Sequence, residues 1–144
     1  MLVPSTNDPN QKIADAIWLI DNHRPLPEEK LIREAVQIFK EQNDEERLAM
    51  AYREYGAFFR SRAVQEQSKY FKANGFLEKS ATYDNRYDKS IEYLKNSVQL
   101  LTKSNKLDKV SSSYLNMGIT YEIAGKTDKA CEAYKRARKS IKSL

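Results

Sequence analysis

The chain of 144 residues is long enough for one domain of ordinary size and too short for two. Apolar residues make up 40% of it and charged residues 31%, a balance that excludes both a disordered polyelectrolyte and a membrane-embedded protein. No proline follows Pro27 and only four glycines occur, so most of the chain lacks the turn residues of an all-β fold. The composition therefore predicts an all-α protein.

The net charge of +5 lies in the last segment, because residues 126–144 hold seven basic and two acidic residues. Basic residues at the end of a terminal helix favour the negative end of its dipole and keep it soluble. A nucleic-acid site would instead interleave basic residues with exposed aromatic ones, whereas Tyr134 stands at core spacing from Ala130 and Ala137. The charge therefore predicts a solvated helix face and disfavours nucleic acid as a partner; a weak homodimer through this face stays an alternative.

Residue types suited to catalysis or metal binding are scarce. Cysteine and histidine each occur once, at Cys131 and His23, which excludes an internal disulfide and a Cys/His zinc site. No nucleophile stands at a recognisable motif spacing, no glycine-rich phosphate loop occurs, and the paired acids stand at helix starts, where they stabilise the positive end. We therefore expect no enzyme activity, cofactor or metal, a surface position for His23, and a packing role for Cys131.

Helix signals recur along the whole chain. Asp8 before a proline predicts the first start, and Pro27 before two glutamates predicts the second. Asp44 begins a third helix, whose apolar spacing continues to Asn74 and predicts one long helix. Further helices are expected from about residues 84, 108 and 127. The six helices make three antiparallel pairs, over about residues 10–43, 44–104 and 106–144. Together these pairs form one domain at residues 10–144, which follows a tail at residues 1–9. The middle pair contains an insertion near residues 60–86.

The last pair carries a spaced pattern of bulky and small residues. Tyr114, Met117, Gly118, Tyr121, Ala130, Tyr134 and Ala137 follow one another at offsets of 3, 1, 3, 9, 4 and 3. These residues resemble the tetratricopeptide repeat, in which small residues let two helices cross closely; the final proline of that repeat is replaced by Lys142. The middle pair repeats the pattern with Tyr52, Tyr55, Gly56 and Phe59, then Ser90, Leu94 and Ser97, and the first pair repeats it loosely with Ala35 and Phe39.

This resemblance implies an all-α stack of antiparallel hairpins, a short right-handed superhelix of about six helices that binds another protein or a peptide without catalysis. In such a stack the first helix of each pair lines a concave groove. The groove positions are Trp18, Met50, Arg53, Ala57, Arg60, Leu115, Asn116, Ile119, Glu122 and Ile123. Their composition suits a peptide with apolar anchors and a carboxylate, although the same residues could instead contact a neighbouring hairpin. The carboxylate-clamp subclass is matched only at Asn116.

The middle pair holds 22 more residues between Gly56 and Ser90 than the last pair holds between the equivalent residues Gly118 and Ala130. We expect the third helix to overrun its repeat, so that this hairpin projects past its neighbours. Insertions of this length are commonly functional. The insertion is therefore a second candidate partner site; the alternative is a small satellite core. Its large side chains are Tyr70, Phe71, Phe76, Leu77 and Tyr83.

Other function classes stay open. The runner-up is a regulatory or sensor protein that binds a small ligand or a nucleic acid, and a third is a periplasmic lipoprotein accessory or immunity-type protein. The longest apolar runs, such as that from Ala16 to Ile20, are too short to span a bilayer. The polar start permits two locations, the cytoplasm, or the periplasm with or without a lipid anchor if a leader was removed before Met1.

Overall fold

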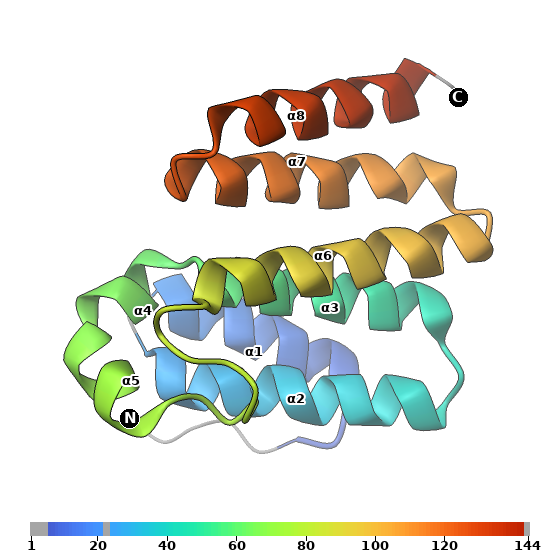
Figure 1. Ribbon diagram of the computed structural model, residues 1–144. Coiled ribbons are helices and arrows are strands. Elements are labelled where there is room, and N and C mark those ends of the chain that lie inside the picture. The colour runs from blue at the N-terminus through green and yellow to red at the C-terminus, as the bar shows by residue number, and fades with distance from the viewer. Residues whose placement is uncertain (1–5, 22–23, 143–144) are drawn as a thin grey trace.

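A computed structural model describes residues 6–21 and 24–142, and every regular element within these ranges is helical (Figure 1). His23 lies outside the described residues. The helices, in chain order, are α1 (Pro9–Asp21), α2 (Pro25–Glu41), α3 (Glu45–Phe59), α4 (Arg62–Glu66), α5 (Ser68–Asn74), α6 (Arg86–Lys103), α7 (Leu107–Ile123) and α8 (Thr127–Lys142). The all-α prediction is confirmed, and the helices beyond the expected six are the two short ones, α4 and α5.

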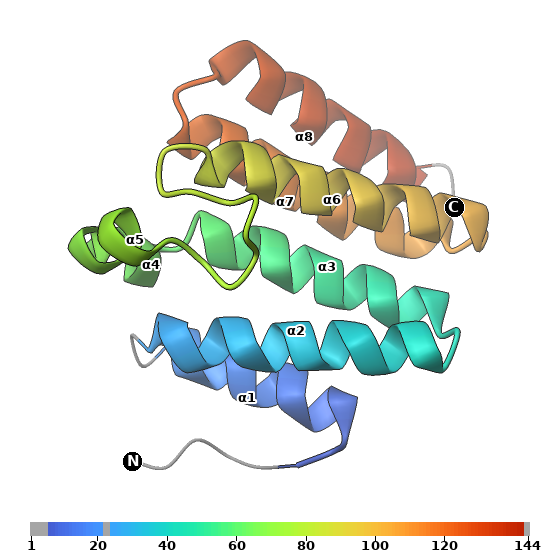
Figure 2. The ribbon, with the colours of Figure 1, turned by 60° about the horizontal axis from the view of Figure 1, so that its bottom comes forward.

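The long helices pack as antiparallel pairs, α1 on α2, α3 on α6 and α7 on α8. Neighbouring pairs meet where α2 packs on α3 and where α6 packs on α7, so the pairs form a continuous stack (Figures 1 and 2). We call the surface formed by α1, α3 and α7 the first-helix face, and the surface formed by α2, α6 and α8 the second-helix face.

Local chemistry explains where these helices begin. Asp44 accepts a hydrogen bond of 3.1 Å from the N–H of Arg47 and so caps α3. Asn43, between α2 and α3, and Gly125, before α8, have φ values of 54° and 78°, a region that asparagine and glycine enter at low cost. α2 begins at Pro25, two residues before the expected start, because both prolines fit a first turn whose N–H groups have no helical acceptor.

The expected long third helix is wrong. α3 ends at Phe59, because Arg60 leaves helical geometry and Ser61 is extended, with φ −65° and ψ 152°. The Ser61 hydroxyl then accepts a hydrogen bond of 3.3 Å from the N–H of Val64 and caps α4. The chain therefore turns at the point where a continuous helix would have projected into solvent.

The insertion folds back onto the first hairpin instead of projecting as an independent arm. Phe71 and Phe76 are 1% and 4% exposed, and they share a core cluster with α1, α2 and α3. Their rings stack at 4.5 Å between centroids, and Phe76 also meets Phe59 edge-on at 5.1 Å. Figure 2 shows α4 and α5 beside the end of this hairpin. The insertion therefore enlarges the main core.

The close helix crossings expected at two glycines are confirmed. A Cβ atom on Gly118 would lie 2.4 Å from the Tyr134 ring, and one on Gly56 would lie 2.7 Å from Cγ of Leu94. Both distances are shorter than any ordinary van der Waals contact. α7 and α8, and likewise α3 and α6, therefore cross at a separation that only glycine permits without adjustment.

Candidate binding surface

Arg53 of α3 and Arg60, the residue directly after α3, connect the first-helix face by reaching across to α7. Nη1 of Arg53 donates a hydrogen bond of 3.1 Å to Oγ of Ser112. Nη1 of Arg60 lies 3.0 Å from the carbonyl oxygen of Asn116 and 3.2 Å from Oγ1 of Thr120, while its Nη2 donates to Oδ1 of Asn116 at 2.7 Å. The structure thus brings Arg53, Arg60 and Asn116 together, although all three lie between helices and are partly buried.

The Arg60 guanidinium is a fixed cation with neutral hydrogen-bond partners. Burial lowers the pKa of Arg60, and the negative charge of Glu54 opposes this shift. Within the described part of the chain no carboxylate lies at ion-pair distance from Arg60, because Glu54 pairs with Arg53 instead, at 3.7 Å. Burial also raises the pKa of Glu54, against the charges of Arg53 and Arg60. An incoming anion would therefore meet a guanidinium that is already positioned.

Large apolar side chains stand exposed on the same face. Met50 on α3 is 37% exposed, and Leu115 and Ile123 on α7 are 47% and 50% exposed. Ala57 and Ile119, from the same two helices, are partly buried. A surface of this kind suits apolar anchors of a peptide.

Trp18, the predicted groove residue of the first pair, is exposed on α1, the first helix of that pair. A cavity of about 470 Å³ opens where α4 approaches the end of α7, and Arg60, Arg62 and Ile123 help to line it. The first-helix face therefore combines apolar and cationic groups.

Glu122 and Asn116, like Arg53 and Arg60, are predicted groove residues that have partners inside the protein. Oε2 of Glu122 accepts a hydrogen bond of 2.6 Å from the Tyr134 hydroxyl, which links α7 to α8. The Asn116 amide donates to the Ser112 carbonyl at 2.8 Å while its oxygen accepts from Arg60. Asn116 therefore orients Arg60. Its amide already has partners inside the protein, so it is not the free amide that a carboxylate clamp requires.

The five insertion residues fall into two groups. Phe71 and Phe76 are core residues, so their predicted role in contacting a partner is wrong; they are buried as the alternative expected, but in the main core and not in a separate satellite core. Tyr70 and Leu77 are 42% and 47% exposed. Tyr83 is partly buried, with the Arg86 guanidinium 3.8 Å from its ring centroid. The exposed apolar surface of the insertion is thus confined to its outer side chains.

Two polar residues of the first-helix face were missed from the sequence. Glu54 stands four residues after Met50 and could have been found by that helical spacing. Thr120 is fully buried, with its hydroxyl 2.8 Å from that of Ser90 and within reach of Arg60. No local pattern marks Thr120, because its role depends on the meeting of α3, α6 and α7.

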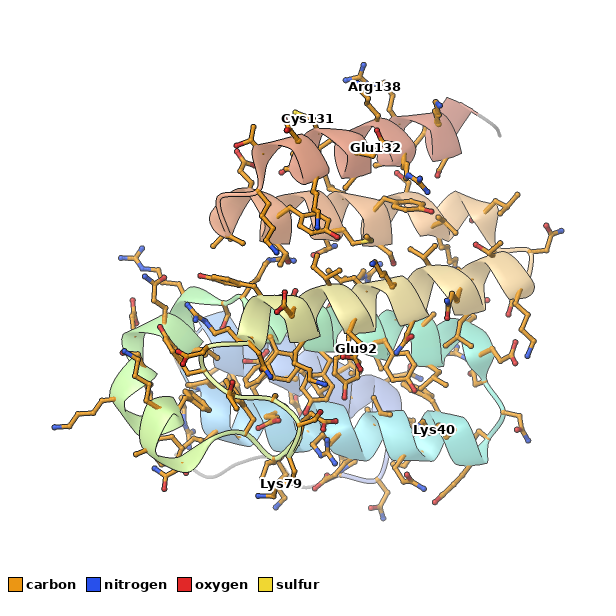
Figure 3. All side chains as sticks on the ribbon, in the orientation of Figure 1. Lys40, Lys79, Glu92, Cys131, Glu132 and Arg138 are labelled. Carbon is orange, nitrogen blue, oxygen red and sulfur yellow. The ribbon has the colours of Figure 1, made fainter. Side chains whose placement is uncertain are left out.

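The remaining polar chemistry is sparse. Within residues 6–21 and 24–142 no group of three or more potential metal ligands occurs, and no helix is long and apolar enough to cross a membrane. Cys131 is exposed on α8, so the prediction of a packing role for it is wrong; Figure 3 shows Cys131 and Arg138 on the outer side of that helix. The first-helix face therefore remains the candidate binding surface.

Stacked antiparallel pairs with glycine at their crossings define a helical-hairpin repeat protein. The family model for the tetratricopeptide repeat matches residues 79–143, a range that contains α6, α7 and α8. Residues 79–143 therefore match the tetratricopeptide repeat, as the residue pattern of the last pair predicts.

One solved structure extends this fold to nearly the whole chain. The crystal structure of the TPR domain of Arabidopsis FLU superposes with a TM-score of 0.68 at 15% sequence identity, and the match covers 94% of this chain and 96% of that one. At this identity the likeness concerns the fold alone. The sequence matches no curated protein. The tetratricopeptide fold is in general a scaffold for protein–protein interaction.

Proposed function

We propose that the protein is a non-catalytic adaptor that binds a peptide, or a segment of another protein, along its first-helix face. The observation that carries this proposal is the Arg60 guanidinium, which neutral acceptors hold beside exposed apolar side chains. Apolar anchors would rest on Met50, Leu115 and Ile123, and a carboxylate of the peptide would pair with Arg60. A charge-assisted pair at a preorganised guanidinium contributes both affinity and direction.

The test begins with the selection of binding peptides from a displayed random library. The best binder is then synthesised in two forms, one that keeps all its carboxylates and one in which the carboxylate critical for binding is replaced by an amide. We expect the amide form to bind wild-type protein about tenfold more weakly, which corresponds to about 1.4 kcal/mol. In Arg60→Gln the two forms should bind alike, whereas Arg60→Lys should retain part of the difference because it keeps the charge. Equal affinity of the two forms for the wild type would overturn the carboxylate assignment.

Matched variants separate the face from the insertion. Leu115→Ser should weaken binding, whereas Leu77→Ser, an equally exposed leucine of the insertion, should leave it unchanged. Lys135→Gln on α8 serves as the charge control for Arg60→Gln. If Leu77→Ser is the damaging substitution, the partner binds the insertion and the first-helix assignment fails. Circular dichroism on each variant confirms that the helical fold is retained.

A further inference from the structure

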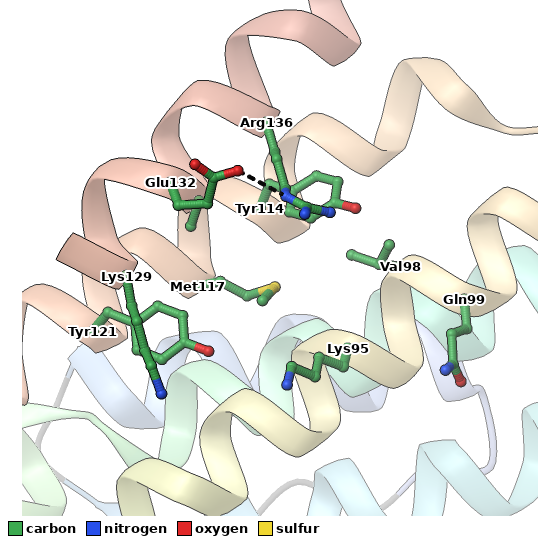
Figure 4. Close-up of a pocket in the computed structure, with 10 residues that line it drawn as sticks. Lys95, Val98, Gln99, Tyr114, Met117, Tyr121, Lys129, Glu132 and Arg136 are labelled. Carbon is green, nitrogen blue, oxygen red and sulfur yellow. Dashed lines mark hydrogen bonds and ion pairs between the residues drawn. The ribbon is translucent and has the colours of Figure 1, made fainter. Parts of the chain in front are cut away.

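A second cavity, of about 440 Å³, opens on the opposite side of α7, between α6 and α8 (Figure 4). Its volume lies in the range of about 300–1,000 Å³ that is typical of small-molecule sites. Val98, Met117 and Ala133 form the apolar floor, together with the rings of Tyr114 and Tyr121. The residues of α7 that line this cavity are not those that meet Arg53 and Arg60, so the site is independent of the proposed peptide surface.

The cavity exists because one aromatic ring is missing from the repeat pattern. Ser90, Leu94 and Ser97 of α6 correspond to Ala130, Tyr134 and Ala137 of α8, so Tyr93 corresponds to Ala133.

In the preceding groove, between α2 and α6, the ring of Tyr93 stacks on Tyr55 at 4.4 Å and on Phe59 at 5.9 Å. The cavity left there is only about 270 Å³ and includes Glu78 and Glu92. Ala133, by contrast, provides a single methyl group and leaves the second groove open.

The rim of the open cavity is cationic. Lys95 comes from α6, and Lys129 and Arg136 come from α8, against one acid, Glu132. Nε of Arg136 lies 3.4 Å from Glu132, and Nζ of Lys129 lies 5.9 Å from the centroid of Tyr121. Across the described residues, neither the Lys95 nor the Lys129 ammonium has a carboxylate partner. Two ammonium groups without a carboxylate partner among the described residues, and Arg136, which contacts Glu132 and the Tyr114 ring, therefore lie around the apolar floor (Figure 4).

We propose that this cavity binds a small organic carboxylate, with its apolar body on the Met117 floor and its carboxylate between Lys95, Lys129 and Arg136. An inorganic anion would leave the apolar floor hydrated, and a neutral apolar molecule would gain nothing from the three cations. A ligand with both parts gains from burial of its body and from charge-assisted hydrogen bonds. The three cations and the apolar floor together therefore favour a ligand that has both a carboxylate and an apolar body.

The test is an NMR titration of the ¹⁵N-labelled protein with 2-naphthylacetate, 2-naphthylethanol and acetate as matched probes. We expect 2-naphthylacetate to shift the amides around Val98, Met117 and Ala133, and the other two probes to bind about tenfold more weakly, because each lacks one of the two recognition elements. Equal binding of the alcohol and the acid, or shifts confined to the first-helix face, would overturn the proposal.

Three variants complete the test. Ala133→Tyr restores the ring that the preceding repeat accommodates and should abolish binding of 2-naphthylacetate while the protein stays folded. Lys95→Gln combined with Lys129→Gln should weaken the binding of 2-naphthylacetate by about tenfold and leave the binding of 2-naphthylethanol unchanged. Arg138→Gln, on the outer side of α8, removes one positive charge outside the cavity and should change nothing. Undiminished binding to folded Ala133→Tyr would contradict the assignment of the site.

Discussion

The hydroxyl of Tyr55 on α3 donates a hydrogen bond of 2.6 Å to Oε2 of Glu29 on α2, a carboxylate that is 1% exposed. The same carboxylate accepts the backbone N–H groups of Leu77 at 2.8 Å and of Glu78 at 3.1 Å. Three segments of the chain therefore share one buried carboxylate: the first hairpin, the middle hairpin and the segment that leads into α6. The insertion is fixed to the first hairpin at this point.

Replacement of Glu29 by alanine should destabilise the protein strongly. The substitution leaves two backbone N–H groups and one phenolic hydroxyl without their acceptor, so we expect the free energy of unfolding to fall by about 2–4 kcal/mol. Urea denaturation followed by circular dichroism measures this change. Glu41→Ala, an exposed glutamate on the same helix, should change stability by less than about 0.5 kcal/mol. Hydrogen exchange at the Leu77 and Glu78 amides should accelerate only in the Glu29 variant.

Tyr55 should make the fold sensitive to alkali. Burial raises the pKa of Tyr55, and the charge of Glu29 and its hydrogen bond raise it further. Since the folded state holds the phenolic proton more tightly than the unfolded state, this contribution is complete below the usual pKa of 10.0 and is lost as pH rises above it. The stability of the wild type should therefore fall above pH 10, and Tyr55→Phe should show a shallower fall. Equal slopes for the two proteins would contradict this account.

Glu78 should contribute to the acid limb of the stability profile. Partial burial raises its pKa, but hydrogen bonds from Ser80 and Tyr93 and the charge of Arg33 outweigh burial and hold the pKa at about 2. A carboxyl whose pKa is lowered on folding stabilises the protein above its usual pKa of 4.5, and this stabilisation is lost between there and about 2. Glu78→Gln should flatten the profile in that window. Urea midpoints at closely spaced pH values measure the effect.

The two crossing glycines should differ in their tolerance of alanine. At Gly56 the new methyl group would meet fully buried Leu94 and lie 3.0 Å from the Ser90 carbonyl oxygen. At Gly118 its three nearest atoms would all belong to the ring of Tyr134, a partly exposed side chain that can move. Alanine favours the helix by about 1 kcal/mol, whereas overpacking costs about 1–3 kcal/mol.

We therefore expect Gly56→Ala to be destabilising and Gly118→Ala to be nearly neutral, while the larger Gly118→Leu should destabilise by about 1–3 kcal/mol. Chemical denaturation of the three variants measures these differences. A greater loss in Gly118→Ala than in Gly56→Ala would contradict the packing described at the two crossings.

Ser61 should contribute as a helix cap without deciding the direction of the chain. Ser61→Ala removes the acceptor of the Val64 N–H and should cost about 1 kcal/mol. The turn after α3 should persist, because Val64 and Phe71 are buried in the core that the insertion shares with the first hairpin. Protection of the Phe71 amide in hydrogen exchange checks this expectation; fusion of α3 and α4 into one helix would contradict it.

The sequence predicts the helix pairs because their signals are local. Asp44, Gly118 and Ala130 act within a turn or at one crossing, and the fixed spacing of the repeat relates them to one another. The break after Phe59 was not predicted, because the helical spacing of apolar residues continues past Ser61 while the cap itself is a single hydroxyl. Helical spacing indicates that a residue is buried but not which element buries it, so it does not distinguish a core role for Phe71 and Phe76 from contact with a partner.

The candidate site was predictable only in part. Helical spacing identifies Met50, Leu115 and Ile123 as one exposed face, since this property depends on the helix alone. The hydrogen bonds of Arg60 depend on the distance between α3 and α7, and the cavity beside Met117 depends on a side chain that is absent. Neither feature leaves a signal in its own stretch of sequence.

The correspondence of Tyr93 and Ala133 has a consequence for how such proteins diversify. Each repeat offers a groove between successive second helices, and one position decides whether that groove is filled by its own ring or left open. Exchange of the residue at this position can therefore close a cavity or create one without altering the helix crossings, which depend on Gly56 and Gly118. In this chain we therefore expect one substitution at position 133 to close the cavity beside Met117 while the geometry of the first-helix face is retained.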